Sequence, residues 1–329
     1  MSSTYSDDRL RLAARLYYID GLGQNEVAKF VKVSQAKVSR LLALARERGI
    51  VRITVADYDP RHPDLEARIR ARFHLDTVVV IKALEGLTAA DLRRAVGHFA
   101  SATLESLIKP GDVVAIAGGR TIYELVHHLP EPRNNALTVV QAMGSVDSTV
   151  SAFDAQEVGR VVAHRLGGSF LALNVPAYIP ERRTRDALLK LPQVRAVHDH
   201  LDRAQVAIVG LATLENSVFV ERGALTPSNI RDLRDAGAIG EMCGRFFDAN
   251  GNECATVWRD QVMSAETSQI RQIPLTIGVV SGSDRSAAIA AAIRGQLLKG
   301  LIIDESGALA LLSLEQPPAA PRKSRSKKK

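Results

Sequence analysis

Residues 24–55 combine polar side chains that can contact DNA with the apolar pattern of two short helices. In the second predicted helix the apolar residues recur at i, i+3, i+4 and i+7 and form one stripe: Val38, Leu41, Leu42 and Ala45. We expect DNA contacts from the opposite face of this helix, from its capping serine and from the start of the preceding helix. These predicted DNA-binding residues are Gln24, Asn25, Ser34, Gln35, Ala36, Lys37, Ser39 and Arg40.

The charge of this segment and the residues after it favour a winged helix-turn-helix over an ordinary helical hairpin. Between residues 24 and 52, seven lysines and arginines stand against two glutamates, and the resulting charge of +5 suits phosphate contacts. Gly49 is placed to end the second helix, and residues 50–55 alternate as a short strand, which predicts a wing. Lys32 occupies the turn position where glycine is usual, so we expect it to adopt positive φ at a cost of about 1 kcal/mol.

Two glycine-containing loops farther along the chain have the composition of ligand-binding loops. Residues 118–121 (GGRT) and 282–286 (GSDRS) each follow a predicted buried strand and open a predicted helix. Backbone amides at a helix start, together with an arginine, suit an anion or a polar ligand, and open α/β sheets bind ligands at this edge. Neither loop matches a Walker A or a GxGxxG motif. An ordinary tight turn between strand and helix is the alternative for each loop.

Residues 237–251 (GAIGEMCGRFFDANG) form a third candidate ligand-binding stretch. It places Glu241, Arg245 and Asp248 beside two phenylalanines, and carboxylates with an arginine near aromatic rings suit a polyol with several hydroxyl groups. Asn250 and Gly251 are typical of a hairpin turn. In the structural alternative the phenylalanines belong to the core and Asp248 only starts the turn.

No arrangement typical of catalysis or metal binding occurs in the sequence. It contains no HExxH, GxSxG or clustered Cys/His motif. The eight histidines are scattered, and His198 and His200, two residues apart on a predicted helix, do not face each other. None of the candidate loops contains a lysine for covalent capture of a sugar. We therefore predict no catalytic residue, no metal site, no cofactor and no enzymatic activity.

Composition is ordinary for a soluble globular protein. Of the 329 residues, 46% are hydrophobic and 24% are charged, and no apolar run is long enough for a membrane span. The N-terminus lacks a signal-peptide core, and Cys243 and Cys254 are the only cysteines, which predicts a cytoplasmic protein without a disulfide framework. The last eight residues, RKSRSKKK, contribute six positive charges to the net charge of +7 and leave +1 for the rest.

Apolar periodicity divides the chain into a helical N-terminal part and a longer part in which strands and helices alternate. A first helix is predicted over residues 7–20. Continuous apolar strands alternating with helices predict a doubly wound parallel sheet of the α/β class. The strands are predicted at 77–81, 113–117, 137–142, 170–174, 206–211, 276–281 and 300–303. The predicted domains are 1–55 (winged helix-turn-helix), 56–64 (linker), 65–315 (effector domain) and 316–329 (disordered basic tail).

Five stretches, in order along nearly the whole chain, together resemble the SorC family of bacterial sugar-responsive regulators. They are QNEVAKFVKVSQAKVSRLLALARERGIVRITV, VVAIAGGRTIYEL, VVQAMGS, GAIGEMCGRFFDANG and IPLTIGVVSGSDRSAAIAAAIRGQLLKGLIIDESGALALL. The resemblance implies a winged helix-turn-helix joined to an effector domain with the fold of ribose-phosphate isomerase and glucosamine-phosphate deaminase enzymes. It also implies that the protein binds double-stranded operator DNA and a small carbohydrate or sugar-phosphate effector, and that it forms a homodimer or homotetramer.

By that resemblance, effector-binding residues lie in the loop at 118–121, at the end of the next strand, in the 237–251 stretch and in the loop at 282–286. The last loop matches the family's GGxxK pattern only in part, since Arg285 replaces the lysine and Asp284 enters. Because Asp284 would repel a phosphate, this departure favours a neutral sugar or polyol. The predicted effector-binding residues are Gly118, Gly119, Arg120, Thr121, Gln141, Gly144, Glu241, Asp248, Gly282, Ser283 and Arg285.

We therefore predict a DNA-binding transcriptional regulator, and more specifically a repressor, of a carbohydrate or polyol catabolic operon, whose DNA binding is modulated by the effector. One alternative is a sugar-phosphate isomerase or deaminase with an accessory helical domain. A second makes the α/β part only an oligomerisation platform.

Overall fold

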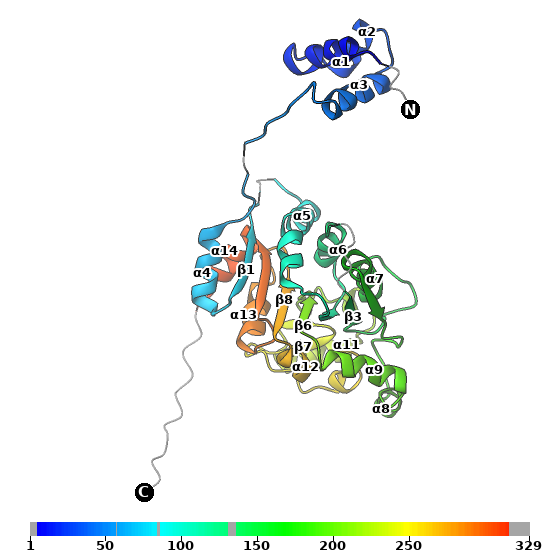
Figure 1. Cartoon of the computed structure of the whole chain (residues 1–329). Coiled ribbons are helices and arrows are strands. Elements are labelled where there is room, and N and C mark those ends of the chain that lie inside the picture. Colours follow the sequence, from blue (N-terminus) through cyan, green and yellow to red (C-terminus); the bar gives the residue numbers. More distant parts are fainter. Residues whose placement is uncertain (1–4, 57, 84–85, 131–135, 316–329) are drawn as a thin grey trace. The chain divides into compact units, whose positions relative to one another are not determined.

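The N-terminal part of the chain is a small helical unit. The chain divides into two units, Met1–Tyr58 and Asp59–Lys329. The computed structural model describes residues 5–56, 58–83, 86–130 and 136–315, so the predicted tail at 316–329 lies outside the described residues. The helices of the first unit (Figure 1) are α1 (Asp7–Ala14), its π-helical continuation η1 (Arg15–Ile19), α2 (Gln24–Phe30) and α3 (Gln35–Glu47).

Helix α3 is held from behind by the apolar stripe that the sequence predicts. The four residues of the stripe are buried in one core with residues of α1 and α2: Val38, Leu41, Leu42 and Ala45. Ser34 caps α3, since its Oγ accepts a hydrogen bond of 3.3 Å from the amide of Lys37. Lys32 has a φ of 50°, as predicted for this turn. The predicted helix-turn-helix is therefore confirmed.

The prediction of a wing strand is wrong. Residues 50–56 form no strand, although their apolar residues alternate. A strand needs a partner for its backbone and an apolar surface for its inner face, and here Ile53 and Val55 are 55% and 80% exposed. The described part of the first unit is a helix-turn-helix without a wing.

Within the described part of the second unit, seven parallel strands form one sheet in the order β1-β9-β8-β5-β2-β3-β4. The chain runs from β2 to β3 and β4 on one side of β2 and then returns to β5 on the other side. The strand order therefore reverses between β2 and β5, which is a topological switch point. The strands are β1 (Thr77–Ile81), β2 (Val113–Ile116), β3 (Leu137–Gln141), β4 (Gly168–Leu171), β5 (Val206–Val209), β8 (Leu275–Val279) and β9 (Gly300–Asp304).

Helices cover both faces of this sheet, because successive residues of each strand enter different cores. In β1, Val78 and Val80 belong to one core, and Val79 and Ile81 belong to the other. Residues of α5, α6 and α7 share the core of Val79, and residues of α4, α9, α13 and α14 share the core of Val78. The predicted doubly wound α/β fold is confirmed (Figure 1).

The remaining elements connect and flank these strands. The helices are α4 (Pro63–Phe73), α5 (Ala89–Leu107), α6 (Arg120–His127), α7 (Ala155–Leu166), α8 (Arg182–Leu188), α9 (Pro192–Leu201), α10 (Val218–Glu221), α11 (Pro227–Asp235), the 3-10 helix η2 (Val257–Asp260), α12 (Thr267–Gln272), α13 (Ser286–Arg294) and α14 (Glu305–Ser313). Strands β6 (Gly240–Met242) and β7 (Arg245–Phe247) pair antiparallel as a separate hairpin. This hairpin closes at Cys243 and Gly244, ahead of the predicted turn at Asn250 and Gly251, where the chain turns a second time.

A buried carboxylate fixes the start of the second unit to the edge of the sheet. Glu66 on α4 is 3% exposed and accepts hydrogen bonds from Arg61, Arg70 and the amide of Val80 on β1. Burial raises the pKa of Glu66, but the hydrogen bonds from Arg61 and Val80 and the two guanidinium charges lower it more, so its pKa lies below the ordinary value. The chain that leaves residue 60 is thereby held along β1, where Arg61 forms a bridge with Ile81.

We expect Glu66→Gln to destabilise the second unit by about 1–3 kcal/mol at pH 7, because the substitution leaves buried donors and two guanidinium groups without their carboxylate. Chemical denaturation of the full chain followed by circular dichroism measures this. Since folding lowers the pKa of Glu66, the difference in stability between parent and variant should shrink as the pH falls below the ordinary glutamate pKa of about 4.3. Glu157→Gln, at a carboxylate of α7 without an ion pair among the described residues, is the control. A loss of stability that is equal at pH 7 and pH 3 would speak against the ion-pair account.

Candidate functional site

The face of α3 that points away from its core presents the predicted DNA-contacting side chains to solvent. Gln35, Ala36, Lys37, Ser39 and Arg40 are all exposed. Asn25 and Ser34 are exposed as well, and Gln24 is half-buried. Within the part of the chain that the structure describes, neither Lys37 nor Arg40 has an ion pair. Both charges are therefore available for the phosphates or base edges of a duplex.

The second unit contains a cavity of about 350 Å³ at the carboxyl ends of three neighbouring strands. Its wall includes Ala117, Gly210 and Val280, which are the residues directly after β2, β5 and β8, respectively. The cavity thus lies at the switch point between β2 and β5, the place where open α/β sheets bind ligands. The start of α6 and residues before α7 complete one side of the wall, and residues near α10 complete another.

Six of the eleven predicted effector-binding residues line this cavity, and they come from three separate stretches. Gly118 lies so close to the carbonyl oxygen of Phe153 that a Cβ there would be 2.6 Å from it, which explains the glycine. The amide of Gly119 donates a 2.8 Å hydrogen bond to the same oxygen. This amide is therefore not free for an anion, whereas the next amides open α6 without a side-chain cap. The six residues are Gly118, Gly119, Arg120, Thr121, Glu241 and Arg285.

The other five predicted residues lie off the cavity wall, and local contacts explain three of them. Gln141 is buried, and its amide group bonds the carbonyl of Met143 and the amide of Leu173. Gly144 lies against the neighbouring backbone, where a Cβ would come within 2.4 Å of the carbonyl oxygen of Val175. Asp248 accepts from the amides two and four residues later and so forms the turn that the structural alternative expected.

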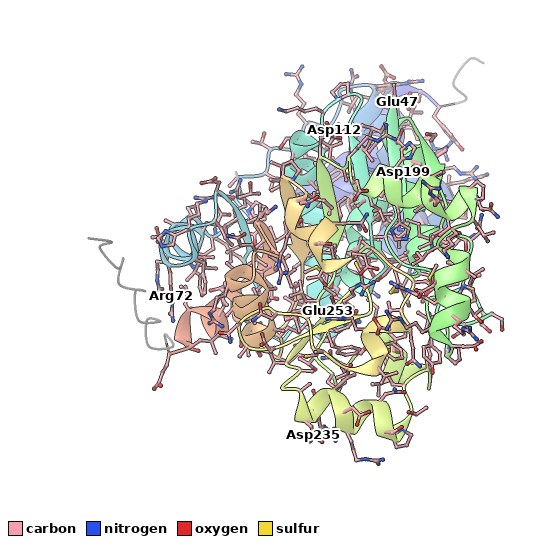
Figure 2. All side chains as sticks on the ribbon, turned by 90° about the horizontal axis from the view of Figure 1, so that it is seen from below. Glu47, Arg72, Asp112, Asp199, Asp235 and Glu253 are labelled. Carbon is pink, nitrogen blue, oxygen red and sulfur yellow. The ribbon has the colours of Figure 1, made fainter. Side chains whose placement is uncertain are left out.

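Gly282 and Ser283, the remaining two, belong to the loop after β8. The amide of Gly282 donates a 2.6 Å hydrogen bond to the buried carboxylate of Asp304, so it is not available to an anion. Arg245, also singled out in the sequence, is 3% exposed and contacts Glu253 at 2.8 Å and Glu266 at 2.9 Å. Figure 2 labels Glu253, which lies among the side chains of the second unit. Arg245 therefore joins two loops and does not reach the cavity.

Several cavity residues were not predicted from the sequence. Arg93 comes from α5, which precedes every loop that the sequence singles out. Thr121 and Ser281 connect the two predicted loops through a contact of 3.2 Å between their hydroxyl oxygens. No motif marks these additional residues, because their position depends on how α5, α7 and α10 pack. Further wall residues that the sequence did not predict include Ser151, Phe153, Asp154, Asn216, Glu221 and Arg222.

Four arginines and three acidic residues line the cavity wall. Arg120 pairs with Glu221 at 2.7 Å, and Arg222 pairs with Asp154 at 2.6 Å. Arg93 has no ion pair among the described residues. Burial, followed by repulsion from Arg120, lowers the pKa of the Arg93 guanidinium, and the charge of Glu124 opposes this shift. An anion placed here would relieve that repulsion.

Glu241 is the buried acid of the cavity. It is 6% exposed and accepts hydrogen bonds from the amide of Gly244 and, at 3.3 Å, from the hydroxyl of Ser217. Burial raises the pKa of Glu241 above its ordinary value, although both hydrogen bonds lower it. In its protonated form a carboxyl group can donate a hydrogen bond to a ligand hydroxyl as well as accept one.

Comparisons with known proteins decide the family. The Sugar-bind family model, which describes a sugar-binding domain, matches residues 61–313. The uncharacterized transcriptional regulator YjhU of Escherichia coli is 31% identical over 96% of this chain and 98% of its own. The erythritol catabolism regulatory protein EryD of Brucella abortus is 30% identical over 93% of this chain and 97% of its own. The crystal structure of the full-length sorbitol operon regulator SorC of Klebsiella pneumoniae has a TM-score of 0.75 at 25% identity and covers 94% of this chain and 100% of its own. The chain belongs to the SorC family.

As a member of the SorC family, the protein is a transcriptional regulator with a helix-turn-helix and a sugar-binding domain. The relatives named above are regulators, so they support the prediction of a non-enzyme and give no support to the isomerase or deaminase alternative. Among the described residues, no helix is long and apolar enough to cross a membrane. The same residues contain no cluster of metal-ligating side chains.

For this SorC-family protein we expect Glu241→Gln to raise the stability of the second unit at pH 8 and to change it little at pH 4. Because folding raises the pKa of Glu241, its favourable contribution is present below the ordinary pKa and is lost as the pH rises through the raised value. Each unit of that shift is worth about 1.4 kcal/mol at high pH. Thermal melts of parent and variant across this pH range measure the effect. A destabilisation of the same size at every pH would show that the buried acid carries no ionisation penalty.

Proposed function

We propose that the protein controls a carbohydrate or polyol catabolic operon and that a polyhydroxylated molecule with one anionic group, bound in the cavity, modulates its affinity for operator DNA. The observation that carries the proposal is the concentration of arginines around a switch-point cavity in a chain that also presents a helix-turn-helix. Since its target is operator DNA, we propose that it acts in the cytoplasm. A homodimer or homotetramer is proposed as well, because two-fold symmetric proteins match paired half-sites.

The sequence alone favoured a neutral effector, because Asp284 was expected to repel a phosphate. We infer the opposite, because arginines line the cavity wall whereas Asp284 does not. Its Oδ1 accepts from Arg285 at 2.9 Å and its Oδ2 accepts from the side chain of Asn216 at 3.0 Å. Asp284 is not among the residues that line the cavity, whereas Arg93, Arg120 and Arg285 are. Guanidinium groups and helix-start amides at one end suit an anion.

Uncharged polar groups of the wall are suited to bind the hydroxyl groups of the effector. Ser151, Asn216 and Ser281 can each donate and accept hydrogen bonds. Glu241 adds a buried carboxyl group to this set. Sugars and polyols carry hydroxyl groups that need such mixed partners, so the wall suits the carbohydrate portion of the proposed effector.

The effector class is tested by thermal-shift measurements with pentose and hexose phosphates and with the matching free sugars and polyols. A ligand at 100 times its Kd stabilises the folded protein by about 2.7 kcal/mol. We expect a phosphorylated ligand to stabilise the parent. The Kd of Arg93→Ala for this ligand should be about 10- to 100-fold higher, because the variant loses one charge-assisted hydrogen bond. Arg94→Ala is the matched control, because Arg94 pairs with Asp91 at 2.9 Å and does not line the cavity. Stabilisation by neutral polyols alone, or an unchanged Kd for Arg93→Ala, would refute the proposed anion site.

The placement of the DNA surface is tested with Lys37→Ala and Arg40→Ala. Each should weaken binding to a duplex enriched from a random library by the parent protein, with a cost of about 1–3 kcal/mol for a lost base contact. Fluorescence anisotropy at matched salt measures the affinities. Arg11→Ala, at an exposed arginine of α1 that pairs with Asp8, is the control. If both α3 variants bind the duplex as tightly as the parent, DNA does not contact this face.

A further inference from the structure

Two glutamine side chains are hydrogen-bonded at the amino ends of α2 and α3. The Nε2 of Gln35 donates a 2.6 Å hydrogen bond to the Oε1 of Gln24. Each glutamine is the first residue of its helix, and the two are eleven positions apart. Gln35 is exposed, whereas Gln24, to which it is bonded, is half-buried.

The contact leaves Gln35 with one donor and one acceptor for another partner. A carboxamide nitrogen carries two N–H donors, and its oxygen has two lone pairs. The Oε1 of Gln24 accepts from one N–H of Gln35. No described residue donates a hydrogen bond to the Oε1 of Gln35. The side chain can therefore donate and accept at the same time from a solvent-facing position at the start of α3, where recognition helices contact base edges.

A donor beside an acceptor in one plane matches adenine in the major groove. Adenine presents the acceptor N7 next to the donor N6–H₂, and glutamine binds this pair through two hydrogen bonds. Guanine presents two acceptors, so the Oε1 of Gln35 would face the O6 of guanine with no proton between them. We propose that Gln35 recognises an adenine in each operator half-site and that Gln24 holds Gln35 in position for it. This inference rests on the proposed DNA-binding function and deepens it.

Gln24 acts here as a positioning residue. A free glutamine side chain loses rotamer freedom when it binds, which weakens binding. Because the bond to Gln24 restricts Gln35 before DNA binds, less of this freedom is lost in the complex. Ser34 caps α3 directly before Gln35, which also restricts the backbone at Gln35. Gln24 therefore influences the preference at the base pair that Gln35 contacts, and at no other.

The test is base preference at each position, measured for full-length parent and variants by selection from a random duplex library and by competition with single-base substitutions. The parent should favour adenine at one position of each half-site by about 5- to 140-fold, which is 1–3 kcal/mol converted at 1.4 kcal/mol per tenfold. Gln35→Ala should abolish the preference at that position alone, and Gln24→Ala should reduce it there. The double variant should show no further loss, because both residues act through one contact.

Gln35→Arg gives the sharpest outcome, since arginine binds guanine through two hydrogen bonds and should change the preferred base from adenine to guanine. Glu47→Gln, at the other end of α3 (labelled in Figure 2), is the control and should leave every preference unchanged. If the parent selects a sequence and Gln35→Ala keeps all its preferences, the inference fails while the proposed function stands. If the parent selects no sequence with or without sugar phosphates, the proposed function itself fails.

Discussion

Parallel pairing of β2 with β5 puts the carboxyl ends of both strands at one edge of the sheet, and the chain leaves them toward opposite faces. After β2 it enters α6, whose Ile122 and Leu125 belong to one core. After β5 it enters the segment of Leu211 and Phe219, which belong to the other core. Two diverging segments cannot fill the space between them, so a cavity lies at this point. The cavity therefore follows from strand order, and its chemistry follows from the side chains that reach it.

Ion pairs organise those side chains and give the wall its charge. Arg222 joins the end of α10 to Asp154 at the start of α7, and Arg120 of α6 joins Glu221 of α10. These pairs connect loops that are far apart in sequence, and a ligand anion could exchange with a carboxylate at either of them. Arg93 differs, since no described carboxylate pairs with it and neighbouring guanidinium groups repel it. Arg93 is therefore a wall arginine that an anionic ligand could contact without displacing a described ion-pair partner.

The fold was more predictable from the sequence than the site. Apolar runs such as residues 77–81 predicted their strands well, because both faces of a parallel sheet are buried and the pattern is continuous. The strand at 50–55 was wrongly predicted, since alternation shows what a strand could cover and not whether a partner exists. Loop motifs located Gly118 and Glu241, whereas Arg93 required knowledge of helix packing. Gln141 and Asp248 had polar groups that the backbone itself uses, which residue type alone does not reveal.

The central claim is that occupation of the cavity and binding of DNA by α3 are energetically coupled. Coupling of this kind is reciprocal and typically changes affinity by about 5- to 150-fold. The most direct measurement is the Kd of the full-length protein for its selected duplex, with and without a saturating sugar phosphate that stabilises it thermally. We expect the Kd to change by such a factor in the parent and to stay constant in Arg93→Ala at a ligand concentration that saturates only the parent. An unchanged Kd for the parent with its cavity occupied would contradict the account.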